Sequence, residues 1–182
     1  MGAIRLNDAT VECRQGDIAD QPDIDVIVNA ANAQLRPGGG VAGAIHRAAG
    51  PGLDRECRPL APIRPGQAVI TGAHDLPNRY VIHCLGPVFG RDEPAAGLLS
   101  DCYRNALALC RQHGIRSVAF PAVSTGVFGY PLEDAARVAF KTVFEGLATP
   151  SPIKLVRLVL FSAGDLRVCE RVLSELTPDG SR

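Results

Sequence analysis

The sequence predicts an α/β fold in which a largely parallel sheet carries helices on both faces. Short runs rich in β-branched residues recur along the chain, and helical patterns of apolar residues lie between several of them. That alternation is typical of layered α/β domains. The chain has 182 residues, 46% of them apolar, and no linker divides it, so we expect one domain with a substantial core.

Six segments are predicted to be strands. Val26, Ile27 and Val28 are apolar at three consecutive positions, which is typical of a strand covered on both faces. The predicted strands are residues 9–13, 26–30, 68–73, 80–84, 117–121 and 155–161.

Four helices are predicted between these strands and after the last of them. The first begins near Val41, and the second covers residues 97–113, where apolar residues have helical spacing. The third begins at Pro131, because proline suits the first helical position. The fourth covers about residues 165–176.

The ends of the chain and its loops complete this expectation. Residues 149–152 (TPSP) read as a loop before the last strand. We expect a single domain over residues 1–177 and a disordered tail at 178–182.

Composition excludes several classes of function. The formal net charge is zero and the pI is near 6.9, so no non-specific binding to nucleic acid is expected. No apolar stretch approaches the roughly 20 residues of a membrane span, and the N-terminus lacks the apolar core of a signal peptide. We therefore expect a cytoplasmic protein without a membrane partner.

Cysteine and histidine usage argues against disulfides and metals. The six cysteines form no CxxC pair and no metal-ligand spacing, so we expect reduced thiols in the core. The four histidines are too scattered to ligate zinc, and His46 and His83 read as structural residues whose hydrogen bonds are satisfied. We predict neither a metal nor a cofactor.

A glycine run between a strand and a helix is the most informative local feature. Gly38, Gly39 and Gly40 remove every side chain from the start of a helix that has no polar cap of its own. The free N–H groups and the positive end of that helix would face whatever lies there. An anion, most simply a phosphate, is the natural occupant.

A second loop has the same character. Gly126 and Gly129 bracket Val127 and Phe128 after an apolar strand and before the helix at Pro131. In a parallel sheet both loops lie at the carboxyl ends of strands, so both can face one crevice and hold two linked phosphates without lysine or arginine.

Several side chains near these loops have two readings each. Phe128 either packs on a sugar or fills the core, and Ser124 and Thr125 either donate hydroxyls to phosphate or shape the turn. Asp17 either makes a turn or accepts a hydrogen bond from the amine of an adenine. Phe161 either stacks on that base or belongs to the core.

Two rival motifs fail on sequence order. Gly38, Gly40 and Gly43 satisfy GxGxxG, but a dinucleotide-binding fold needs the pattern directly after the strand and an acidic residue about 20 positions later. The segment around Ser124 resembles a nucleophile elbow, but all four histidines precede it, so the triad order of an α/β-hydrolase is impossible.

Five blocks in order carry a family resemblance. They are QGDI at 15–18, VNAAN at 28–32, GGGVAGAIHRAAG at 38–50, VIHCLGP at 81–87 and PAVSTGVFGYP at 121–131. Together they resemble a macrodomain of the MacroD-related branch, from near residue 12 to the last helix. The resemblance implies a three-layer α/β/α sandwich with a central mixed, mostly parallel sheet that binds ADP-ribose.

The resemblance also implies roles for individual residues. Asp17 and Ile18 would hold the adenine, with Phe161 as a neighbour, and Asn32 would bind the distal ribose. The pyrophosphate would be lined by Gly39, Gly40 and Val41 on one side and by Ser124, Thr125, Gly126, Val127 and Phe128 on the other.

One departure from the family pattern concerns catalysis. At the position of Ala42, MacroD-type hydrolases carry an aspartate that activates or orients the catalytic water. Two functions stay open: hydrolysis of ADP-ribose esters, whether on mono-ADP-ribosylated proteins or in O-acetyl-ADP-ribose, and non-catalytic reading of ADP-ribose. For the hydrolase we expect a substrate-assisted water attack with Asn32 and Gly40 as catalytic residues.

Overall fold

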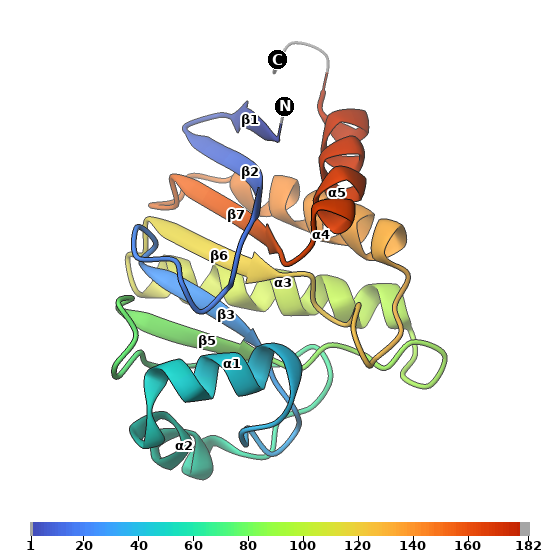
Figure 1. The fold of residues 1–182 in the computed structure, drawn as a ribbon. Helices are drawn as coiled ribbons and strands as arrows, with labels where there is room; N and C mark the ends of the chain where they lie inside the picture. Colours follow the sequence, from blue (N-terminus) through green and yellow to red (C-terminus); the bar gives the residue numbers. More distant parts are fainter. Residues whose placement is uncertain (1, 179–182) are drawn as a thin grey trace.

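The computed structural model describes residues 2–178, which form a three-layer α/β/α sandwich around a seven-stranded sheet (Figure 1). The strand order is β1-β2-β7-β6-β3-β5-β4. The strands are β1 (Ala3–Leu6), β2 (Ala9–Gln15), β3 (Val26–Ala30), β4 (Ala68–Gly72), β5 (Tyr80–Cys84), β6 (Ser117–Pro121) and β7 (Leu155–Leu160).

The sheet is mixed, with a parallel centre. Strands β2, β7, β6, β3 and β5 run parallel, and β1 and β4 are antiparallel strands at the two edges. All six predicted strands are present, and three have the predicted bounds. Strand β1 was not predicted, because it has only four residues, none of them fully buried, and pairs with β2 alone.

The helices are α1 (Gly40–Ala49), α2 (Pro51–Cys57), α3 (Ala95–Gln112), α4 (Leu132–Leu147) and α5 (Ala163–Leu176), with a 3₁₀ turn at Arg58–Leu60. Helix α2 was not predicted. Pro131 caps α4 from outside instead of occupying its first position. Helix α5 begins two residues before the predicted start, because the Ser162 hydroxyl accepts a hydrogen bond from the Asp165 amide.

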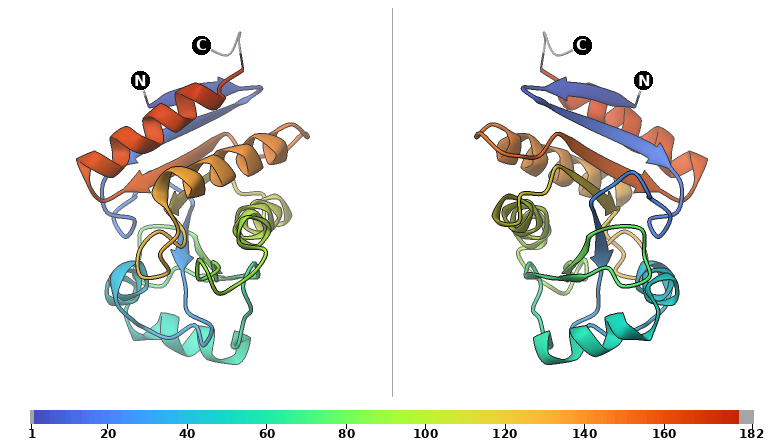
Figure 2. Two further views of the ribbon diagram at one scale, coloured as in Figure 1. Left: turned by 90° about the vertical axis from the view of Figure 1, so that its right-hand side faces the viewer. Right: turned by 90° about the vertical axis from the view of Figure 1, so that its left-hand side faces the viewer.

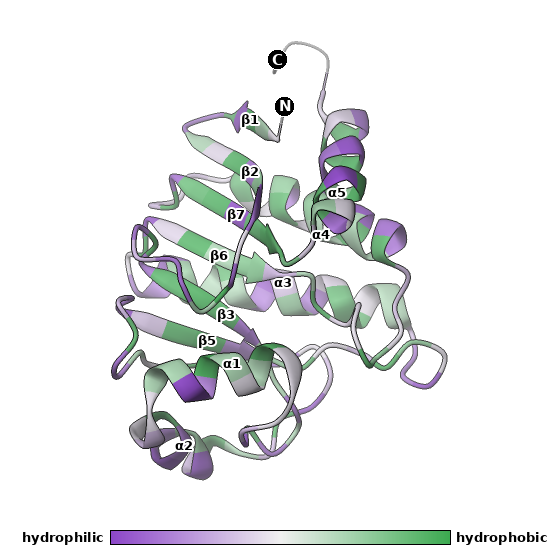
Figure 3. Ribbon diagram, viewed as in Figure 1, coloured by the Kyte–Doolittle hydropathy of each residue, from purple (hydrophilic) through white to green (hydrophobic). Residues whose placement is uncertain are grey.

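Alternation along the strands builds two hydrophobic cores. Val26 and Val28 point into the core under α3, α4 and α5, whereas Ile27 points into the core under α1 and α2. Figure 2 shows α1 and α3 on opposite sides of the sheet. The hydropathy colouring in Figure 3 is mostly apolar along β6 and β7, apart from one hydrophilic band in β7, and mixed along the helices. The loops that follow β3 and β6 therefore begin between the two helical layers that cover the sheet.

All six cysteines are free and buried in the core, as predicted. Burial raises the pKa of Cys57 to about 11, so this thiol stays protonated.

Of the tail predicted at 178–182, all but Pro178 lies outside the described residues. Between residues 2 and 178 no helix is long and apolar enough to cross a membrane, and no three potential metal ligands come together.

An ion cluster joins α4 to α5. Glu133 and Glu175 each bond to both Arg137 and Arg171, with Arg171 Nη2 2.9 Å from Glu133 Oε2. Hydrogen bonds from Arg171 and then Arg137 lower the pKa of Glu133 from 4.5 to about 2. The cluster is exposed, so we expect its effect to be screened by salt.

This cluster predicts a loss of stability in acid. Because the pKa of Glu133 is depressed in the folded state, its contribution is complete above about pH 4.5 and disappears as the pH falls toward about 2. We expect the urea midpoint of Glu133→Gln to fall less between pH 7 and pH 3 than that of the wild type. Glu145→Gln, an exposed site on the same helix without an ion pair in the described chain, should behave as the wild type.

Candidate functional site

The loops after β3 and β6 leave the sheet side by side and then diverge. The two strands are parallel neighbours, with Val26 opposite Val118. From β3 the chain continues through α1 and α2 toward β4 and β5, and from β6 it continues through α4 to β7 on the other side. In α/β folds such a reversal of direction forms a crevice at the carboxyl ends of the strands, where ligands bind, so this end of β3 and β6 is the candidate site and is called the crevice below.

The first loop places unpaired amides at this crevice. Gly39 is the N-cap of α1 and no side chain caps the helix, so the first-turn N–H groups point outward without a partner. Gly40 has φ +56°, a conformation that favours glycine. A Cβ at Gly43 would lie 2.2 Å from the Gly38 carbonyl oxygen, so glycine there lets α1 approach the loop closely.

The second loop offers amides in a different way. Thr125 N donates to Ala122 O at 3.3 Å and Gly129 N donates to Gly126 O at 3.0 Å, which forms two successive turns. In the described chain the amides of Gly126, Val127 and Phe128 have no acceptor. Helix α4 begins only at Leu132 with acidic residues in its first turn. Here the loop itself, rather than the helix terminus, faces the crevice.

Residues from three segments near the candidate site belong to one hydrophobic cluster on the α1 side of the sheet. Ile18 after β2, Val41 in α1 and Phe128 after β6 all pack in or against the same hydrophobic cluster. Phe128 is only partly buried, so its ring covers the core and also remains accessible at the crevice. Val127 beside it is fully exposed.

The two hydroxyls of the second loop differ, because only that of Thr125 bonds the turn. Thr125 Oγ1 donates to Ala122 O at 2.7 Å. Ser124 has φ +66°, and its hydroxyl is buried without a partner against Gly86, where a Cβ would lie 2.0 Å from Ser124 Oγ. The interpretation as a turn-shaping side chain therefore fits Thr125, whereas Ser124 contributes to the turn through its positive φ and keeps an unpaired hydroxyl in the described chain.

Asn32 holds the glycine loop in shape. Its Nδ2 donates to Arg36 O at 2.8 Å, and its Oδ1 accepts from Arg36 N at 3.0 Å. A primary amide has two N–H groups and two lone pairs. One donor and one acceptor of Asn32 therefore remain for a ligand.

Asp17 and Phe161 lie together at the neighbouring end of the sheet. Asp17 is exposed, and its Oδ1 accepts from Ala19 N at 2.8 Å, which is the expected turn. Phe161 follows β7 directly and is 85% exposed, so it does not belong to the core. Gln15 at the end of β2 reaches the Phe161 carbonyl at 3.4 Å, which joins the two positions.

The two structural histidines differ from each other. Burial lowers the pKa of His83 to about 3; the neutral ring accepts from Asn29 Nδ2 at 3.1 Å and donates to Thr71 Oγ1 at 2.9 Å. The prediction that His46 is satisfied was wrong: both ring nitrogens are buried without a hydrogen-bond partner. Helix α1 carries His46 into the core, and Asn29 Oδ1 in β3 is also buried and unpaired within the described chain.

Sequence reasoning missed the residues beneath the loop after β2. Arg157 in β7 is 2% exposed and bonds to Gln21 and Asp23 of that loop. The available signal was an arginine in the middle of the apolar run LVRLVL.

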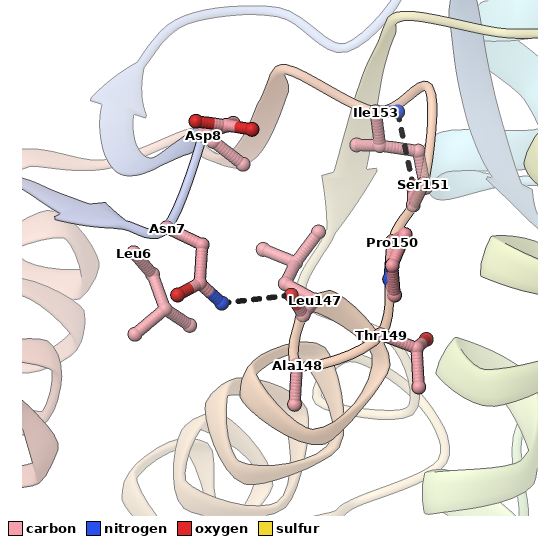
Figure 4. Close-up of a pocket in the computed structure, with 10 residues that line it drawn as sticks. Leu6, Asn7, Asp8, Leu147, Ala148, Thr149, Pro150, Ser151 and Ile153 are labelled. Atoms are coloured by element: carbon pink, nitrogen blue, oxygen red, sulfur yellow. Dashed lines mark hydrogen bonds between the residues drawn. The ribbon is translucent and has the colours of Figure 1, made fainter.

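A cavity of about 220 Å³ lies away from the crevice (Figure 4). It is lined by the β1–β2 turn and by residues 147–153, which precede β2 and β7, and so it lies at the amino ends of the parallel strands. Its Asn7 amide caps the last turn of α4 by donating to Leu147 O, and Ser151 Oγ accepts from Ile153 N. These polar groups serve the protein's own backbone.

Known proteins resemble this chain over most of its length. The Macro domain family model matches residues 28–139. An O-acetyl-ADP-ribose deacetylase of Klebsiella pneumoniae (strain 342) is 48% identical over 164 residues, which cover 87% of this chain and 93% of that protein. A macro domain-containing protein of Streptomyces griseus is 47% identical over 166 residues, which cover 88% of this chain and 92% of that protein.

Solved structures resemble it as well. An Oceanobacillus iheyensis macrodomain with ADP has a TM-score of 0.92 at 40% identity and covers 96% of this chain and 95% of its own. A Trypanosoma brucei macrodomain in complex with ADP-ribose has a TM-score of 0.84 at 38% identity and covers 90% of this chain and 68% of its own.

Proposed function

This chain belongs to the macrodomain family, and we propose that it binds ADP-ribose and hydrolyses ADP-ribose esters. The observation that carries the proposal is the pair of loops after β3 and β6, whose unpaired amides follow the carboxyl ends of two neighbouring parallel strands. Backbone N–H groups at such positions bind phosphate oxygens through charge-assisted hydrogen bonds.

The ligand would lie along the edge of the sheet. The diphosphate would contact the amides of Gly39, Gly40 and Val41 from one side and those of the second loop, residues 124–128, from the other. The adenine would lie toward Asp17, Ile18 and Phe161, and the distal ribose toward Asn32 and Phe128. This order is supported by the strand order, in which β2 and β7 lie on one side of β6 and β3.

Ester hydrolysis would be substrate-assisted. A water held by the Gly39–Gly40–Val41 backbone and by a ligand phosphate attacks the ester at the distal ribose, and the ester C–O bond breaks. One proton of the water passes through that phosphate to the leaving oxygen. The carboxylic acid and ADP-ribose are the products. Asn32 orients the ribose hydroxyls, and the amides at the start of α1 stabilise developing negative charge without reorganising. Mono-ADP-ribosylated proteins and O-acetyl-ADP-ribose are the proposed substrates.

The residue at position 42 favours a slow enzyme and keeps a second function open. Ala42 is buried in the first turn of α1, where the MacroD-type aspartate would stand. A protein without that carboxylate has a crevice equally suited to reading ADP-ribose without turnover. Binding does not separate the two functions, so the test must measure product.

The substitution Ala42→Asp separates them. We expect the wild type to release ADP-ribose from a carboxylate-linked mono-ADP-ribosylated protein, and acetate from O-acetyl-ADP-ribose, above a buffer control. The aspartate should increase that rate only modestly, because the water is already held. Tight ADP-ribose binding with no turnover in the wild type, and strong turnover only in Ala42→Asp, would instead identify a reader.

A further inference from the structure

A fully buried arginine supports the loop that carries Asp17. Arg157 lies at the centre of β7, and its guanidinium donates to Glu12 Oε1 at 2.7 Å, to Gln21 Oε1 at 2.8 Å and to both carboxylate oxygens of Asp23 at 2.8 and 2.9 Å. Three acceptors from β2 and the following loop thus converge on one side chain.

These contacts fix the orientation of the Gln21 amide. Arginine has donors only, so the Gln21 oxygen must face Arg157 and the Gln21 nitrogen must face away from it. That nitrogen donates to the Asp17 carbonyl at 2.8 Å, and the Asp20 amide donates to the same carbonyl at 3.0 Å. Gln21 is 5% exposed, so water does not replace these bonds readily.

The clamp determines where the Asp17 carboxylate points. With its carbonyl held by two donors and its Oδ1 accepting from Ala19 N at 2.8 Å, both the main chain and the side chain of Asp17 are constrained. In the described chain Oδ2 has no hydrogen-bond donor. It is the atom left to meet a ligand at the crevice.

Stability alone does not explain this arginine. Burial of a guanidinium costs several kcal/mol of desolvation, and well-packed apolar residues often replace buried ion pairs without loss. The other side chains of β7 are apolar, so an apolar residue at 157 would continue the strand. The polar loop beneath the crevice is what the arginine serves.

We propose that Arg157 is a positioning residue for base recognition, acting through Gln21 to hold the Asp17 carboxylate where it accepts a hydrogen bond from the exocyclic amine of adenine. This inference rests on the proposed function, because Asp17 reads a base only if the ligand carries one. Arg157 itself does not touch the ligand.

The test compares two ligands in a variant that cuts one bond. In Gln21→Glu the carboxylate still accepts from Arg157, but it has no N–H for the Asp17 carbonyl. Calorimetry measures the affinity for ADP-ribose and for its hypoxanthine analogue, in which a carbonyl oxygen replaces the amine. We expect the wild type to prefer adenine and Gln21→Glu to lose about tenfold of that preference, the worth of one hydrogen bond.

Glu12→Ala is the matched control. It removes a carboxylate from Arg157 without touching Gln21, so thermal stability should fall while the base preference stays. Hydrogen exchange of the Asp20 amide, measured without ligand, should accelerate in Gln21→Glu and not in Glu12→Ala. If Gln21→Glu does not fold, Gln21→Met removes the same donor at similar volume.

Each of the other outcomes contradicts either the role of Arg157 or the proposed function. An unchanged base preference in a folded Gln21 variant, or an equal loss in Glu12→Ala, overturns the role of Arg157. Equal binding of both ligands by the wild type overturns it too, since Asp17 then reads no amine. Failure of the wild type to bind ADP-ribose at all refutes the proposed function itself.

Discussion

Replacement of Gly126 by valine is expected to weaken ADP-ribose binding by at least about 100-fold while the protein stays folded. A Cβ at this exposed glycine meets nothing within 4 Å, and its φ lies outside the left-handed region, so the fold tolerates a side chain. A ligand does not, because the isopropyl group would stand over the amides of Gly126, Val127 and Phe128. Loss of two charge-assisted hydrogen bonds, about 1.5 kcal/mol each or more, accounts for the factor.

Calorimetry and thermal unfolding together check this result. Gly39→Val, on the other side of the proposed diphosphate, should also weaken ADP-ribose binding while the protein stays folded, since Gly39 has φ −86°, ψ −178° and open space around it. Ala148→Val adds similar bulk at the cavity near the amino ends of the parallel strands and should leave ADP-ribose binding unchanged. Loss of binding in Ala148→Val, with full binding in Gly126→Val, would move the ligand site to that cavity.

Asn32→Ala is expected to lower the rate of ester hydrolysis on the order of 100-fold and to weaken ADP-ribose binding less. The side chain is proposed to orient the reacting ribose, and removal of one oriented polar group from a reaction centre typically costs this much. It also holds the Arg36 main chain through two hydrogen bonds. The measurement is single-turnover release of acetate from O-acetyl-ADP-ribose beside ADP-ribose calorimetry.

A neighbouring variant separates contact with ligand from order in the loop. Arg36→Ala removes the ion pair of Arg36 Nε with Asp54 Oδ1 at 2.9 Å but leaves the main-chain bonds to Asn32. We expect it to stay within about twofold of the wild type, in line with the small worth of exposed ion pairs. Equal losses in both variants would assign Asn32 to loop order alone, and an unaffected rate in Asn32→Ala would contradict its catalytic role.

The strands were predictable where the local signal is strong. Segments Val26–Ala30, Tyr80–Cys84 and Ser117–Pro121 have the predicted bounds, because continuous apolar runs suit strands that are covered on both faces. Strand β1 and helix α2 escaped prediction. The first is a half-exposed edge strand and the second is a seven-residue helix that opens with proline and glycine, so neither has a long periodic pattern.

The candidate site was also predictable only in part. Glycines at 38–40 already indicate an uncapped helix start, and the structure has one there. The partners of several polar side chains were not predictable: the turn role of Thr125 was one of two alternatives, Asn32 bonds Arg36, and His46 has no partner among residues 2–178. Such choices depend on which neighbour the fold supplies.

The amino-acid sequence by itself determined the fold class and the two glycine-containing loops, because apolar periodicity and backbone freedom are properties of neighbouring residues, and its five motif blocks carried the resemblance to the family. Only the tertiary structure decided that β3 and β6 are parallel neighbours, and that Arg157 reaches Gln21, 136 positions away. Strand order and the burial of a charge bring together residues far apart in the chain, and no local pattern carries that information.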